Sequence, residues 1–298
     1  MTRSDSVTAT EIAIWRDTHY HRLPELAVRS EEAAAEFVDE VGFCLLFPAK
    51  GMEVPTLWEA INGRRRPLPK THYDHAISMT WDYKDSLPAS KRVYYGKLLR
   101  QKPTLVSLSL LPYFYALSDN YGDLDEYLEA YADGKMSEPA KRVYEALLEH
   151  GPSPTSLLRW RSGLGGKENA SRFDRAIVEL QSSLRIVKTG ISDANRWKYC
   201  YVYEVLPRWL PEVVERAREI KAREAMRVLV TRHLQNVLVA TIPEIATLFS
   251  WDQGLLTATV ERMIEDGTLR QVSVARSTRP TGQGSGAGDD RKTLCLAS

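Results

Sequence analysis

The chain has 298 residues, of which 43% are hydrophobic, enough for the cores of two or three small domains. It contains no apolar window of about 18 residues, which excludes a membrane-spanning helix, and its first residues lack the apolar core of a signal peptide. We therefore expect a cytoplasmic protein. Cys44, Cys200 and Cys295 are scattered and lack CxxC spacing, which argues against a disulfide framework and against a zinc site.

The net charge is only +1, yet the charges are segregated along the chain. Residues 1–60 carry 5 basic and 11 acidic side chains, and residues 61–118 carry 10 basic and 3 acidic ones. Residues 119–149 carry 3 basic and 9 acidic side chains, and residues 153–205 carry 9 basic and 5 acidic ones. A near-neutral protein with one surface facing a polyanion shows such segregation, although solvated helix faces are an alternative explanation.

The first 70 residues predict an N-terminal unit that resembles the start of a winged helix. Helices are expected over 10–23 and 30–41, and an apolar run over 42–48 is typical of a short buried strand. A short helix over 57–61 precedes an exposed basic turn that contains Arg64, Arg65 and Arg66. The wing of this unit cannot be read from the sequence. Residues 71–136 form a second segment, rich in aromatic side chains, which we expect to be mostly helical.

Residues 137–212 predict a complete central winged helix. Ser137 caps a first helix that ends at Gly151, and a second helix is expected with Ser153 at its cap and Pro154 at its first position. A third helix buries Phe173, Ile177, Leu180 and Leu184. Strands over 184–188 and 199–205 follow. Three helices and then a β-ribbon give the winged-helix order, and the third helix is the one that enters the major groove.

The same order recurs in residues 213–298. Helices are expected over 222–235 and 253–266, with a capping box at Thr241–Glu244 between them and strands over 269–274 and 292–296. Equivalent elements lie 83 to 88 residues apart, which indicates a tandem duplication of a domain. The predicted fold is therefore α+β and mostly α, with tandem winged-helix domains and a helical middle segment.

Several short segments resemble the AlkZ/YcaQ group of DNA glycosylases. They are Val41-Gly42-Phe43-Cys44-Leu45-Leu46, Leu87-Pro88, Glu149-His150-Gly151-Pro152-Ser153-Pro154 and Arg185-Ile186-Val187. The resemblance covers most of the chain and implies tandem winged helices around a curved, basic DNA-binding cleft.

The chain departs from this family at the catalytic strand. The family carries a Gln-apolar-Gln or Gln-apolar-Asp motif there, whose side chains position water and stabilise the charged sugar. Aligned by Gly42, those places fall on Cys44 and Leu46, which offer no suitable group. The resemblance therefore implies that the reaction is lost or relocated.

Relocated catalysis has three candidate acids, Asp82, Asp85 and Glu53. The run from Trp81 to Asp85 combines two acids with Lys84, which can bind a phosphate, and with two aromatic rings that can stack on an extruded base. The competing explanation is an ordinary helix end with Asp–Lys pairs, and Glu53 can equally be a simple loop acid. His72 and His75 lie three residues apart, but no third ligand accompanies them, so no metal is expected.

The predicted DNA contacts are basic residues of the units described above. Arg172 and Arg175 are placed on the outward side of the central recognition helix, where the alternative is an ordinary solvated face. The full set is Arg64, Arg65, Arg66, Lys84, Lys167, Arg172, Arg175, Arg196, Lys198, Arg276 and Arg279. Such side chains neutralise phosphates or enter a groove.

We therefore expect a monomeric DNA-binding protein of repair or genome maintenance without the standard glycosylase activity. Its expected partner is double-stranded DNA, damaged or intact, with no membrane and no cofactor. One alternative is a glycosylase for alkylated bases that uses relocated acids. A second is a winged-helix transcriptional regulator, which needs a dimer with paired recognition helices. A structural protein without nucleic acid is a third.

Overall fold

A computed structural model describes residues 6–69, 74–195, 198–275 and 293–297. In the first unit a capping box between Thr8 and Glu11 starts the first helix, and Ser30 caps the second. Gly42, with a φ of +75°, turns the chain from α2 into β2. The elements are β1 (Ser6–Thr8), α1 (Ala9–His19), η1 (Pro24–Leu26), α2 (Glu31–Val41), β2 (Phe43–Leu45), α3 (Leu57–Asn62), α4 (His75–Ala89), β3 (Val93–Gly96), η2 (Leu99–Gln101) and β4 (Thr104–Ser107).

Two short helices, α5 (Leu111–Tyr115) and α6 (Tyr127–Ala132), lead into the central unit. Ser137 caps its first helix, as predicted. The elements that follow are α7 (Glu138–His150), β5 (Ser153–Pro154), α8 (Thr155–Arg161), η3 (Lys167–Asn169), α9 (Ala170–Ser182), β6 (Ile186–Ser192) and β7 (Cys200–Val205). Helices α10 (Leu206–Trp209) and α11 (Pro211–Arg218) connect to the C-terminal unit.

The C-terminal unit begins with a long helix and contains the predicted capping box. The Thr241 hydroxyl accepts from the Glu244 amide, and the Glu244 carboxylate accepts from the Thr241 amide at 2.8 Å. The elements are α12 (Ala222–Val237), β8 (Ala240–Thr241), α13 (Ile242–Phe249), α14 (Gln253–Glu265), β9 (Leu269–Ala275) and β10 (Thr293–Leu296).

One order of elements, helix, strand, helix, helix, strand and strand, occurs three times, from α2 to β4, from α7 to β7 and from α12 to β10. The strands pair in the same way each time. The orders are β2-β4-β3, β5-β7-β6 and β8-β10-β9, so the last strand of each unit lies in the middle. Strand β1 adds to the C-terminal sheet by pairing in parallel with β9. The repeat therefore has three copies, where the sequence predicted two complete ones.

The prediction that residues 71–136 are mostly helical is wrong for two segments. Strands β3 and β4 pair with each other, and β4 pairs with β2 through Cys44 and Leu105. Both strands are buried on both faces and rich in aromatic and β-branched residues, so they lack the alternation that identifies a half-exposed strand. The first sheet therefore extends beyond residue 70.

Two smaller predictions in the central unit are also wrong. Ser153 and Pro154 form β5, pairing with Tyr203 and Val202, so α8 begins at Thr155. Strand β6 begins at Ile186 because Leu184 has a φ of +56°, which no strand residue adopts.

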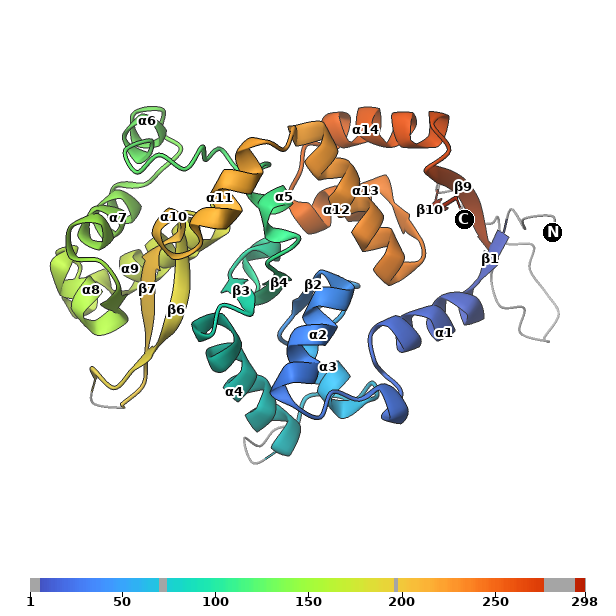
Figure 1. Cartoon of the computed structure of the whole chain (residues 1–298), viewed down its shortest axis with the longest axis horizontal. Coiled ribbons are helices and arrows are strands. Elements are labelled where there is room, and N and C mark those ends of the chain that lie inside the picture. The colour runs from blue at the N-terminus through green and yellow to red at the C-terminus, as the bar shows by residue number, and fades with distance from the viewer. Residues whose placement is uncertain (1–5, 70–73, 196–197, 276–292, 298) are drawn as a thin grey trace.

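One apolar cluster joins the three units, in addition to the core of each unit. Phe43 of β2, Val187 of β6 and Leu229 of α12 belong to the same buried cluster. The N-terminal helix is held against the C-terminal unit, because the Trp15 indole donates to the carbonyl of Gln235 at 2.8 Å. Figure 1 shows the central unit at the left and the C-terminal unit at the upper right. Helices α2, α3 and α4 of the first unit lie at the lower centre, while α1 and β1 lie at the right beside the C-terminal unit. Within the described ranges, no helix is both long and apolar enough to cross a membrane.

Candidate functional site

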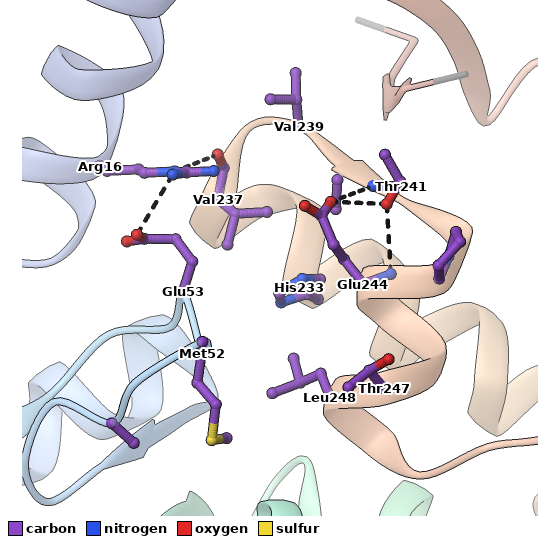
Figure 2. Close-up of a pocket in the computed structure, with 14 residues that line it drawn as sticks. Arg16, Met52, Glu53, His233, Val237, Val239, Thr241, Glu244, Thr247 and Leu248 are labelled. Carbon is purple, nitrogen blue, oxygen red and sulfur yellow. Dashed lines mark hydrogen bonds and ion pairs between the residues drawn. The ribbon is translucent and has the colours of Figure 1, made fainter. Parts of the chain in front are cut away.

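A cavity of about 650 Å³ lies where the first and C-terminal units meet (Figure 2). Apolar side chains form much of its wall, and polar groups reach it from several elements. The lining residues are Arg16, Ala49, Gly51, Met52, Glu53, His233, Val237, Val239, Ala240, Thr241, Pro243, Glu244, Thr247 and Leu248. A cavity of this size, mostly apolar with a few converging polar groups at a unit boundary, is typical of a ligand site.

Glu53 lines this cavity from the loop between β2 and α3. Its side chain is 43% exposed and faces two guanidinium groups, with Arg16 at 3.6 Å and Arg22 at 3.7 Å. Arg16 is itself held by a hydrogen bond from its Nε to the carbonyl of Val237, 3.0 Å away. Glu53 is therefore oriented toward the cavity by groups from outside its own loop.

His233 lines the cavity from α12. It is 4% exposed, packs against Phe43 and Phe249, and its Nδ1 has no hydrogen-bond partner among the described residues. Burial, and secondarily the charge of Arg16, lower the pKa of His233 to about 3. The ring is therefore neutral at physiological pH.

The segment from Phe43 to Leu46, which comprises β2 and the residue after it, precedes the cavity loop and turns alternate side chains in opposite directions. Phe43 and Leu45 face the apolar cluster that joins the three units. Cys44 and Leu46 face the core of the first unit, among Val38, Leu57 and Leu105, and neither is more than 1% exposed. Burial raises the pKa of the Cys44 thiol, so this side chain stays neutral. Neither Cys44 nor Leu46 lines the cavity.

A family model described as AlkZ related matches residues 28–250, three-quarters of the chain. The chain belongs to the AlkZ-related family. Its structure also resembles that of the Streptomyces sahachiroi DNA glycosylase AlkZ, with a TM-score of 0.56 and 14% sequence identity. The match covers 98% of this chain and 70% of that one, and at this identity it shows a shared fold. No curated protein matches the chain.

In this AlkZ-related protein the three candidate acids lie in different surroundings. Glu53 lines the cavity, whereas Asp82 is exposed on α4 and does not. Asp85 accepts hydrogen bonds from Lys188 and Tyr199. Burial would raise the pKa of Asp85, but hydrogen bonds from Lys188 and Lys84 outweigh it and lower the pKa. The carboxylate of Asp85 is thus already paired with two buried lysines, Lys84 and Lys188.

Lys84 was predicted to bind a phosphate, and the structure contradicts this. Its side chain is fully buried, and its ammonium donates to the hydroxyls of Tyr199 at 2.6 Å and Tyr201 at 2.8 Å. A group with no exposed surface cannot reach DNA. Trp81 and Tyr83, predicted to stack on a base, also lie outside the cavity, with Trp81 packed against Phe47.

The predicted DNA-binding arginines differ in how far they are neutralised. Arg65 pairs with Asp17 at 3.1 Å, Arg66 pairs with Asp74, and Arg172 pairs with Glu138 at 3.2 Å. Arg175, on the exposed side of α9, forms no ion pair with any described residue. Lys167, Lys198 and Arg64 are exposed. Arg196, Arg276 and Arg279 lie outside the described residues, as does His72.

Within the described ranges, no cluster of three or more His, Cys, Asp or Glu residues could hold a metal.

Sequence reasoning missed Arg16, Arg22 and His233. Arg22 is buried and makes a hydrogen-bonded pair with Glu59, at 2.7 Å. Arg22 follows α1 outside any helix, and His233 is a lone histidine within α12, so neither stands out in the sequence as part of a site. The sequence does not show that residues 16, 53 and 233 meet, because they are far apart along the chain.

Proposed function

We propose that this AlkZ-related protein binds double-stranded DNA through tandem winged-helix units, in repair or genome maintenance, and does not excise bases through the pair of residues that its family uses. The observation that carries the proposal is the burial of Cys44 and Leu46 in the core of the first unit. A thiol and an isobutyl group in an apolar core can neither position water nor stabilise positive charge on a sugar.

The three copies of the same order of elements support the winged-helix interpretation. In each copy a second and third helix precede a β-hairpin, the arrangement that places the third helix against DNA. We propose the central unit as residues 137–212 and the third as 213–298. The first unit is proposed to continue past residue 70 through the β3–β4 hairpin, since both strands complete its sheet.

Relocated base excision is the second candidate function, and Glu53 favours it. Of the three candidate acids, Glu53 lines the cavity beside Arg16 and His233. A carboxylate at this position is the group that an oxocarbenium-like sugar requires. The ion pairs to Arg16 and Arg22 count against it, because they already neutralise the charge that would stabilise the sugar.

Binding and single-turnover base release on the same duplexes separate these functions. The duplexes carry either an intact purine or an N7- or N3-alkylated purine. We expect salt-dependent binding to both and release of the alkylated base at the rate of the protein-free control. Absence of duplex binding would refute the first proposal. Robust release would refute the loss of excision, and its disappearance in Glu53→Gln, but not in Asp82→Asn or Asp85→Asn, would assign the reaction to Glu53.

A further inference from the structure

The connection between β3 and β4 has an unusual backbone. Arg100 and Gln101, two consecutive residues with side chains, have φ values of +46° and +57°. A left-handed backbone is unfavourable for any residue other than glycine, and such strain is concentrated at functional sites. Both side chains are exposed, so packing of these side chains in a core does not account for the conformation.

The same connection carries three cations, Lys97, Arg100 and Lys102. Within the described part of the chain none of them forms an ion pair, in contrast to Arg65 and Arg172. The Arg100 guanidinium donates to the carbonyl of Gly51, at 3.3 Å, which leaves its charge uncompensated. Burial, and then the charges of Lys102 and Lys84, lower the pKa of Lys97. The hairpin tip therefore lacks anions.

The hairpin tip lies against the recognition helix of the central unit. The Ser182 hydroxyl of α9 donates to the carbonyl of Lys97 at 2.8 Å. Gln101 from the tip and Arg175 from α9 line one open groove of about 860 Å³, together with Ser171, Asp174, Val178, Glu179, Ser182 and Ser183. Two units thus contribute to one surface, with Gln101 from the tip and Arg175 from α9. The two carboxylates of this groove already have partners, because Asp174 pairs with Arg159 at 2.7 Å and Glu179 accepts a hydrogen bond from the Ser137 hydroxyl at 2.6 Å.

We propose that the β3–β4 tip, residues 97–102, is a second phosphate-binding element, which contacts the sugar–phosphate backbone of the duplex beside α9. The left-handed residues at 100 and 101 hold the cations of the tip next to the groove that contains Arg175. Backbone contacts of this kind fix the register of a protein on the duplex without reading its sequence. This inference rests on the proposed DNA binding and adds a contact that the basic helix alone would not make.

The test compares charge-removing variants in fluorescence anisotropy with a labelled duplex at several salt concentrations. Lys97→Gln/Lys102→Gln should weaken binding at low salt by roughly tenfold or more and reduce the slope of log affinity against log salt by about 2, because each lysine that neutralises a phosphate adds about 1 to that slope. Lys102→Gln alone should reduce the slope by about 1. It is the safer variant for folding, because the side chain of Lys102 is exposed.

Lys135→Gln is the matched control, since it removes the same charge from a lysine that already pairs with Asp133 at 3.3 Å. It should leave affinity and slope unchanged. If Arg175→Glu weakens binding but Lys102→Gln and the double variant behave as wild type, the tip makes no contact and this inference fails while the proposed function stands. If the wild type does not bind the duplex at all, both fail. Stronger binding of the wild type to an acidic peptide than to DNA would also overturn the inference.

Discussion

The ammonium of Lys188 donates a hydrogen bond to the backbone carbonyl of Lys84, 3.0 Å away, and so ties β6 of the central unit to α4 of the first. Both lysine side chains are fully buried and share the carboxylate of Asp85. The ring of Tyr201 lies 4.6 Å from the Lys84 ammonium and 4.4 Å from that of Lys188. Two cations and one anion leave this buried cluster with excess positive charge. Burial, followed by the charge of Lys84, lowers the pKa of Lys188 to about 8.

This cluster predicts that stability increases with pH above 8. The pKa of Lys188 is depressed in the folded state from an ordinary value of 10.5, so between pH 8 and 10.5 the unfolded chain binds more protons. The free energy of unfolding should therefore rise in this range by up to about 1 kcal/mol per pH unit from this group. Urea unfolding at pH 7.5, 8.5 and 9.5 measures this rise in the free energy of unfolding. In Lys188→Met the rise should be smaller, and an equal rise in both proteins would show that Lys188 does not titrate there.

The sequence predicted the parts of the fold that local signals encode. Ser137 and the Thr241–Glu244 pair mark helix starts by short-range hydrogen bonds, and both were read correctly. Strands β3 and β4 were missed because their identity depends on strand pairing, β3 with β4 and β4 with β2, and β2 lies about 60 residues before β4 in the chain. Without these two strands the third copy of the repeat could not be recognised in the sequence.

The candidate site was predictable only in part. Glu53 was identified as an acid of a loop near Gly51, a local feature, and it does line the cavity. Lys84 was misplaced, because its sequence neighbours are polar while its side chain is buried by Tyr199 and Tyr201 from another unit. Whether a charged residue faces solvent or a neighbouring unit is a tertiary property, which composition does not encode.

Acid should destabilise the protein through His233. Its pKa is depressed to about 3 in the folded state from an ordinary value of 6.5. The unfolded chain therefore binds a proton that the folded state excludes, and stability that is complete above pH 6.5 is lost progressively as the pH falls toward 3. We expect a loss from this group of about 1 kcal/mol per pH unit below 6.5.

Substitution of His233 by Phe tests this. The ring keeps its packing against Phe43 and Phe249 but cannot titrate, so the dependence of urea unfolding on pH between 6.5 and 4.5 should become flatter. His75→Gln, at an exposed position that starts α4, should retain the slope of the wild type. A slope unchanged in His233→Phe would contradict the prediction.

Arg175 should contribute more to DNA binding than Arg172. Arg172 already pairs with Glu138, whereas Arg175 has no ion pair among the described residues and lines the open groove along α9. Reversal of both to Glu should weaken duplex binding severely and flatten its salt dependence. Of the single reversals, Arg175→Glu should lower affinity more, measured by anisotropy at low salt. An unchanged salt slope in the double variant would remove α9 from the interface.

Restoring the family pair at positions 44 and 46 should destabilise the protein without restoring excision. Cys44 and Leu46 are at most 1% exposed, within an apolar core, so Cys44→Gln buries an amide without a partner and should cost about 1–3 kcal/mol. Leu46→Asp buries a carboxyl group and should cost more. The control is Leu46→Met, which conserves volume and should cost less than about 1.5 kcal/mol.

Urea unfolding gives these costs, and single-turnover release of an alkylated purine shows whether function follows. The side chains at 44 and 46 face the core and do not line the cavity, so even a folded double variant should bind DNA and leave the base in place. A double variant with the urea midpoint of the wild type and rapid base release would show that β2 presents these positions to DNA. That result would contradict both the burial argument and the proposed loss of excision.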